Sequence, residues 1–183
     1  MFIKNVKDSP WIVCIVGLKN LYVEDVDRFL RMIKDRVCLS FQVFNADRIA
    51  GWRHVFFGAI NAVEAFENGL QVSNNIPIET LLYVSCQDQI VKALKMVGIR
   101  RGVERIVFVF FAKSIEEFEG LSSRLEAFGI QDDSILEVTC GKLEALKCIF
   151  EVSETSLETI GGDLSEALTN LIVEKGALIP TLR

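Results

Sequence analysis

The residues best suited to bind a ligand lie between positions 45 and 99. This stretch contains His54, the only histidine of the chain, and the polar run SCQDQ at residues 85–89 between two apolar helical segments. Amide and hydroxyl groups hydrogen-bond a ligand well, but they supply no strong acid, base or nucleophile. The mixture indicates binding rather than catalysis.

The groups that common catalytic sites require are missing from this pattern. His54 is the only conventional base, and no serine or cysteine lies in a nucleophile-elbow motif. The sequence has neither a Walker-type phosphate loop nor a dinucleotide-binding glycine motif. Five cysteines without a C-x-x-C pair indicate reduced thiols in a cytoplasmic protein rather than a zinc site or a disulfide framework. We therefore expect a protein that is not an enzyme and needs no metal or other cofactor.

Hydropathy favours a buried sheet and argues against a membrane span. Apolar residues make up 50% of the 183 residues, and the mean hydropathy is +0.33. The longest apolar run, residues 106–112, is much shorter than the roughly 20 residues that cross a membrane. The excess apolar residues fit a parallel or mixed sheet buried on both faces, together with a surface that a partner covers.

Charge is distributed unevenly, although the net charge of −5 argues weakly against nucleic acid. Residues 1–113 contain 15 basic and 11 acidic residues, whereas residues 114–174 contain 3 basic and 14 acidic residues. Such asymmetry can place a basic face opposite an acidic one; the alternative is an ordinary solvated surface.

Hydrophobic periodicity predicts one α/β domain over residues 1–183, with a small mixed sheet of about four strands flanked by helices. Strands are predicted at 11–18, 39–44, 104–112 and 135–138, with 104–112 central because both of its faces are apolar. Helices are predicted at 22–36, 54–68, 77–85, 88–97, 114–128, 142–150 and 164–175, with helix-start patterns at Thr155 and Asp163. Gly176 is predicted to end the last helix.

The ordered set of residues in the ligand-binding stretch carries a family resemblance. Its members are Asn45-Ala46-Asp47, His54, Ala59, Ala62, Ala65-Phe66, Gly69, Ser73-Asn74, Glu79, Leu81-Leu82-Tyr83, Ser85 and Gln89-Ile90. This succession resembles the small kinase-binding subunit of the KEOPS complex, the TPRKB-like family with archaeal and yeast relatives. Two positions depart from the family pattern: Cys86 stands where glycine is expected, and Asp88 where an uncharged residue is expected.

The resemblance implies a non-catalytic accessory subunit. Such a subunit binds the small atypical kinase/ATPase of KEOPS and helps to recruit tRNA through its unpaired 3′ CCA end. The complex makes threonylcarbamoyl-adenosine beside the anticodon, and the transferase chemistry and its metal belong to another subunit, which is an indirect partner. With the basic residues after position 89, the resemblance suggests these RNA contacts: Asn45, His54, Asn74, Ser85, Gln87, Gln89, Lys92, Lys95, Arg100 and Arg101.

The last predicted helix and the tail are the expected kinase surface. Their apolar residues are either core or interface: Leu164, Leu168, Leu171, Ile172, Leu178 and Ile179.

His54 likewise has two interpretations. It either hydrogen-bonds locally as a structural residue or presents its ring to a base. Cys86 is expected to be a structural replacement rather than a nucleophile.

Two other classes of protein remain open at this point. A small-molecule-binding regulatory α/β domain would also explain polar residues without catalytic groups. A freestanding hydrolase would depend on His54, and its turnover would disappear in His54→Ala. Assays with tRNA and with common metabolites separate these possibilities from an RNA-binding subunit.

Overall fold

A computed structural model describes residues 1–160 and 162–182. Its centre is an antiparallel sheet in the order β1-β2-β4-β3, with a short strand, β5, also paired to β2. The strands are β1 (Phe2–Asn5), β2 (Ile12–Lys19), β3 (Ser40–Asn45), β4 (Ile106–Ala112) and β5 (Ile130–Gln131). Strand β4 lies between β2 and β3, and every one of its residues is buried, which confirms the predicted central strand.

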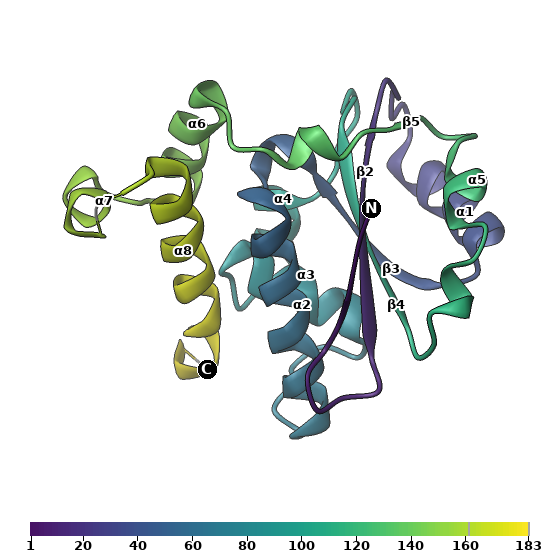
Figure 1. Cartoon of the computed structure of the whole chain (residues 1–183), viewed down its shortest axis with the longest axis horizontal. Coiled ribbons are helices and arrows are strands. Elements are labelled where there is room, and N and C mark those ends of the chain that lie inside the picture. Colours follow the sequence, from purple (N-terminus) through teal and green to yellow (C-terminus); the bar gives the residue numbers. More distant parts are fainter. Residues whose placement is uncertain (161, 183) are drawn as a thin grey trace.

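Helices cover both faces of this sheet. In Figure 1, α1 (Val26–Val37) and α5 (Leu121–Leu125) lie on one side, and α2 (Gly51–Glu67), α3 (Ile76–Ser85) and α8 (Leu164–Ala177) on the other. Successive residues of β2 enter different cores: Val13 packs under α2 and α3, and Cys14 under α1. Full burial of one such side chain contributes about 1.5–3 kcal/mol.

The α/β class is confirmed, whereas the strand pairing differs from the mixed or parallel sheet expected. All of the pairings between the described strands are antiparallel. Strands with two apolar faces need cover on both sides, and here helices supply it for antiparallel strands. Hydropathy therefore indicates that both faces of a strand are covered, but it does not indicate whether neighbouring strands run parallel or antiparallel.

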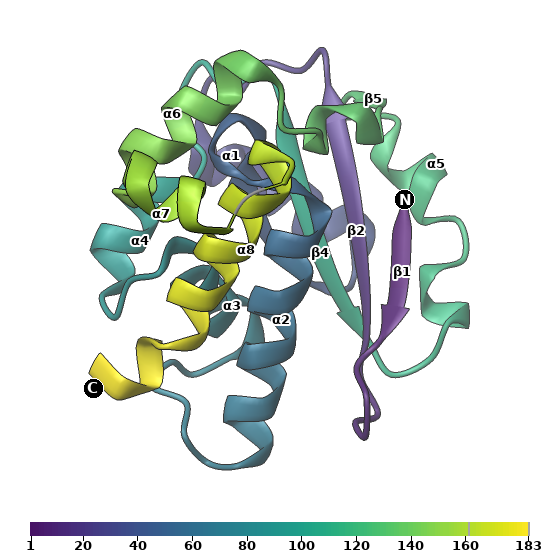
Figure 2. The same ribbon diagram turned by 60° about the vertical axis from the view of Figure 1, so that its left-hand side comes forward.

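The helices beyond the sheet form an outer layer. Helix α4 (Ile90–Val97) packs on α3, and α8 packs on both α2 and α3 (Figure 2). Helix α6 (Cys140–Phe150) and α7 (Glu154–Ile160) precede α8. The prediction that Gly176 ends α8 is wrong, because the helix continues to Ala177. A Cβ at Gly176 would lie 2.7 Å from the carbonyl oxygen of Tyr83, so the glycine permits close packing on α3.

Two predicted elements are wrong. The helix expected over 114–128 is divided into a 3₁₀ turn, η2 (Glu116–Phe118), and α5, with Gly120 between them at φ +67°. Residues 135–138 form no strand. The first two belong to the 3₁₀ helix η3 (Asp133–Leu136), and the other two follow it. Strand β1 was not predicted, because its short sequence shows no clear alternation. Within the described residues, no helix is both long and apolar enough to cross a membrane.

Candidate functional site

The segment between α4 and β4, residues 99–105, forms a loop that exposes three arginines. We call it the basic loop; it carries Arg100, Arg101 and Arg105 together with Glu104. Backbone hydrogen bonds fix it to neighbouring segments. Val23 N–H donates to Val103 O (3.1 Å), Gly102 N–H to Val23 O (2.8 Å) and Ala46 N–H to Arg105 O (3.1 Å). The arginines therefore project from an anchored backbone.

One pocket beside the basic loop has a volume of about 460 Å³ and is bordered by Asn45 and Asp47. Arg105 Nη2 lies 2.7 Å from Asp47 Oδ1. Nearby, Arg48 Nη1 donates to Met96 O at 2.8 Å, at the C-terminal end of α4. Burial, and then the neighbouring Arg100, lower the pKa of Arg48. The guanidinium of Arg48 is therefore partly removed from water and lies near a second cation, Arg100.

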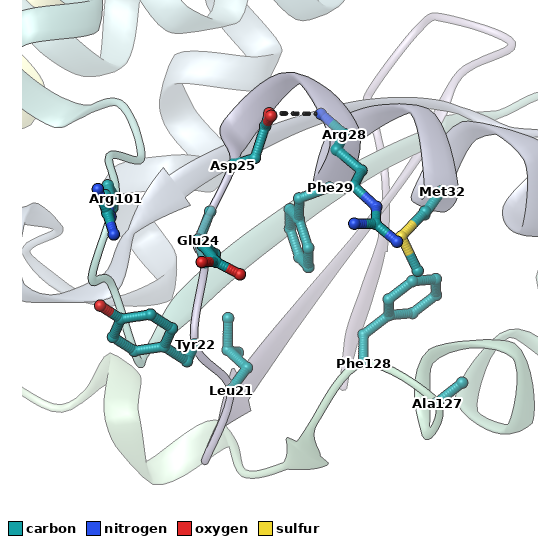
Figure 3. Close-up of a pocket in the computed structure, with 11 residues that line it drawn as sticks. Leu21, Tyr22, Glu24, Asp25, Arg28, Phe29, Met32, Arg101, Ala127 and Phe128 are labelled. Atoms are coloured by element: carbon teal, nitrogen blue, oxygen red, sulfur yellow. Dashed lines mark hydrogen bonds between the residues drawn. The ribbon is translucent and has the colours of Figure 1, made fainter.

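A larger hollow lies on the other side of the loop, and Figure 3 shows its walls. Its volume is about 690 Å³, and Arg101 borders both this hollow and the smaller pocket. Tyr22, which is 63% exposed, lies with Arg101 on one side of the view, and Met32 and Phe128 lie on the other. An exposed aromatic ring beside arginines is the combination that stacks bases and neutralises phosphates.

Carboxylates also border this hollow. Glu24 and Asp25 accompany the cations Arg28 and Arg101. Asp25 is engaged locally, because it accepts a hydrogen bond from Arg28 N–H at 2.9 Å and caps α1 (Figure 3). The hollow therefore combines aromatic side chains with charges of both signs, and its two cations, Arg28 and Arg101, lie on different sides of it (Figure 3).

His54 occupies a structural position. It is 2% exposed, and its Nδ1 accepts a hydrogen bond from Ala50 N–H at 3.1 Å. Its Nε2 therefore carries the proton and donates to Val84 O at 2.8 Å. Burial lowers the pKa of His54 to about 4, and its ring packs edge-on against Phe150. With both nitrogens engaged, this side chain presents no ring edge to a base, contrary to its place among the expected RNA contacts.

The other expected RNA contacts divide between buried and exposed positions. Ser85 is fully buried and donates to Leu82 O at 3.0 Å, and Asn45 is 5% exposed and accepts from Asp47 N–H at 3.0 Å. Burial excludes Ser85 as a direct contact, whereas Asn45 borders the smaller pocket. Gln87 is half-buried, and the exposed members are Asn74, Gln89, Lys92, Lys95, Arg100 and Arg101.

Only two of the exposed candidates, Arg100 and Arg101, line the hollows beside the basic loop. Lys92 and Lys95 lie on α4, which leads into the loop, and Gln89 is the residue before that helix. Asn74 lies in the turn before α3 and lines neither hollow. The structure therefore brings two of the four basic candidates to the hollows and leaves Asn74 apart from them.

The backbone conformation at position 86 explains why glycine is expected there. Cys86 follows α3 with φ +54°, the left-handed conformation that glycine adopts at helix C-termini. Its thiol is buried and contacts Ile172 O at 3.4 Å. Burial raises the pKa of Cys86 to about 12, so the thiol stays protonated and is a poor nucleophile. The neighbouring Asp88 is exposed and needs no buried partner.

The apolar stripe of α8 is mostly core. Leu168, Ile172 and Ile179 are fully buried, so they cannot form the predicted kinase surface, and Leu171 is half-buried. Leu164 and Leu178 are exposed, at opposite ends of α8.

Exposed apolar residues also gather near the C-terminal end of α8. We call Leu70, Ala177, Leu178 and Pro180 the C-terminal patch; three of them line a shallow pocket of about 180 Å³.

Several residues of this site were not found from the sequence. Tyr22, Arg48 and Arg105 acquire their positions through backbone pairing between distant segments, such as Val23 with Val103. Arg105 belongs to the run of basic residues after position 89, whereas Tyr22 and Arg48 carried no signal in the sequence. Among the described residues, no group of three or more His, Cys, Asp or Glu side chains could hold a metal ion.

The fold and surface define a helix-covered α/β protein with an arginine-bearing loop near an exposed tyrosine, and with an exposed apolar patch. The family model for the kinase binding protein CGI-121 matches residues 23–178. The chain belongs to this family of kinase-binding proteins. Comparison with curated proteins finds no match.

Proposed function

We propose that this protein is a non-catalytic KEOPS subunit that binds the small atypical kinase and holds tRNA by its 3′ CCA end. Family membership supports the kinase partner. The observation that carries the RNA part is the position of Arg101, which borders a hollow with exposed Tyr22 on one side and the Asn45–Arg105 pocket on the other. Aromatic stacking and cations for phosphates are the two requirements of a single-stranded RNA site.

In this proposal the unpaired CCA nucleotides lie along the basic loop. A base stacks on Tyr22, which contributes about 1–3 kcal/mol as base–aromatic contacts do. Arg100 and Arg101 neutralise the phosphates that join the bases, and Lys92 and Lys95 attract the neighbouring strand at longer range. Asn45 provides polar groups at the edge of the pocket. Threonylcarbamoyl transfer takes place on another subunit in the cytoplasm.

The kinase surface in this proposal is the C-terminal patch rather than the whole α8 stripe. Its leucines, Leu70 and Leu178, are 63% and 53% exposed, so neither is needed to fill the core. Exposed apolar side chains that gather on one surface are typical of protein interfaces. The patch lies at the end of α8 that is distant from α6 (Figures 1 and 2).

The test compares the binding of intact tRNA and of tRNA that lacks its CCA end, over a series of salt concentrations. Intact tRNA should bind at least about tenfold more tightly. Arg101→Gln should flatten the salt dependence by about one unit, because one phosphate contact is lost. Tyr22→Leu should weaken binding while keeping the slope, because stacking releases no counterion.

Lys7→Gln is the control, since Lys7 is exposed between β1 and β2 and lies in neither hollow. Equal affinity for the two tRNAs would show the RNA assignment to be wrong. Tight binding of a small metabolite without tRNA binding would instead favour a regulatory domain.

A further inference from the structure

Lys142 is a half-buried lysine in the first turn of α6, outside the surface described above. It lines a pocket of about 320 Å³ together with Asp47, Arg105, Ser134 and Thr139. Its Nζ donates one hydrogen bond, to Ile135 O at 3.0 Å. An ammonium group has three donors, so with one acceptor among the described residues Lys142 keeps capacity for a ligand in the pocket.

The charge of Lys142 is poorly compensated. Within the described residues no carboxylate lies within ion-pair distance of its Nζ, and Asp47 in the pocket wall is paired with Arg105 at 2.7 Å. Burial lowers the pKa of Lys142 to about 8, Asp47 opposes that effect, and Arg105 adds to it. Removing a cation from water without a partner is unfavourable, and functional sites are where proteins retain such groups.

The pocket of Lys142 is continuous with the basic loop. Asp47 and Arg105 line both this pocket and the pocket of about 460 Å³ that Arg100 and Arg101 border. A series of cations therefore runs from Arg101 through Arg105 to Lys142. Glu137 is also in the wall, but it is exposed.

We propose that Lys142 and Arg105 together hold a phosphate group, namely a backbone phosphate of the RNA strand whose 3′ end lies on the basic loop. This inference rests on the proposed RNA binding. A guanidinium and an ammonium that converge on one pocket suit a phosphodiester, because the first donates in a planar fork and the second acts as a point charge. The hydroxyl groups of Ser134 and Thr139 in the same wall provide further donors.

A distinctive pH dependence follows from this geometry. A bound phosphate favours the protonated lysine, so binding takes up a proton when free Lys142 is neutral, and affinity falls as the pH rises above about 8. The charged groups that face Lys142 are Asp47 of the 3₁₀ helix η1 (Ala46–Arg48), Arg105 before β4 and Glu137 after η3. His54 of α2 is also close, and it is neutral throughout this range.

The experiment measures the affinity for intact tRNA at pH 7 and pH 9 for the full chain and for two substitutions. Lys142→Gln should lower the affinity about fivefold or more at pH 7 and remove the decrease between the two pH values. Lys142→Arg should keep the affinity and also remove the decrease, because arginine stays charged. Lys7→Gln should behave like the unchanged protein, and thermal unfolding checks that each variant folds.

A second arm titrates inorganic phosphate in the absence of RNA and follows the backbone amide signal of Gly141, which lies in the pocket wall. Lys142→Gln could keep its tRNA affinity and yet lose the response to phosphate. That result would show that the bound phosphate does not belong to RNA, and it would assign the site to a free phosphate compound. Unchanged tRNA affinity and an unchanged phosphate response would overturn the site itself. If intact and CCA-lacking tRNA bind equally, the proposed function fails, and the phosphate arm still tests Lys142.

Discussion

Both ring nitrogens of His54 are committed to backbone groups that belong to different parts of the chain. Nδ1 accepts from Ala50 at the start of α2, and Nε2 donates to Val84 near the end of α3. The neutral ring therefore joins α2 and α3, and it packs against Phe150 of the larger core. Protonation of Nδ1 would remove one of these hydrogen bonds and place a charge in an apolar region.

We predict that the free energy of unfolding decreases as the pH falls from 6.5 to 4. The pKa of His54 is lowered to about 4 in the folded protein from 6.5, so in this window the unfolded state binds the extra proton. The loss approaches about 3 kcal/mol at the acidic end. Urea unfolding at a series of pH values measures it. His54→Gln should be less stable at neutral pH and flatter across the window, and a flat profile in the unchanged protein would refute the assignment.

Cys86→Gly should fold and bind both partners. Glycine relieves the left-handed backbone at φ +54°, which costs a side chain about 1–2 kcal/mol, but loses the buried thiol and its contact with Ile172 O. These effects oppose each other, so the stability should change by less than about 1 kcal/mol. Cys86→Val is the contrast and should be clearly destabilised, because a β-branched residue disfavours positive φ. A folded Cys86→Gly protein that binds neither tRNA nor kinase would overturn the structural role.

At the scale of elements, α8 is specified partly by a local capping residue and partly by its packing against other helices. Asp163 begins the helix by accepting hydrogen bonds from Ser165 and Glu166 N–H, as its sequence pattern predicts. The inward residues Leu168 and Ile172 then fill the core between α8 and its neighbours. Gly176 sets how closely the helix approaches α3.

Gly176→Ala should destabilise the protein by about 1–3 kcal/mol. Alanine favours a helix over glycine by about 1 kcal/mol, but its Cβ would lie 2.7 Å from Tyr83 O and force α8 away from α3. Gly141→Ala in α6 is the matched control, because a Cβ there meets nothing within 4 Å and should leave stability equal or higher. Urea unfolding of both variants measures the difference, and equal stabilities would contradict the packing role of Gly176.

At the scale of the whole molecule, the proposed RNA surface and the C-terminal patch belong to different elements. The RNA surface involves the basic loop and the start of α6, and the patch involves the end of α8 and the turn after α2. The two views in Figures 1 and 2 place the C-terminal end of α8 away from α6. The proposed RNA surface and the C-terminal patch therefore share no residue.

The double substitution Leu70→Glu and Leu178→Glu should lower kinase affinity at least about tenfold (roughly 1.4 kcal/mol or more) and leave tRNA affinity unchanged. The reason is that both leucines are exposed, so the charges disturb a partner and not the core. Ile115→Glu is the control, because Ile115 is 56% exposed and lies at the turn before α5. Binding titrations with the kinase and with tRNA measure the two affinities. Unchanged kinase affinity would place the interface elsewhere.

Much of the local structure is a consequence of the sequence alone. The two apolar faces of residues 106–112 specified a central strand, and Asp163 specified the start of α8. The unevenly distributed basic residues specified a positive segment after α4, which includes Arg100 and Arg101. These features depend on neighbours a few residues away, so periodicity and capping patterns reveal them.

Only the tertiary structure decided which of the candidate groups reach a ligand. His54, Ser85 and Leu168 have the right types and spacing for function, but long-range packing buries them. Tyr22 and Lys142 had no place in the predicted site, and each reaches the cations of the basic loop through segments about 80 or 40 residues away in the chain. Burial and the meeting of distant segments are properties of the whole packed chain, so no local pattern contains them.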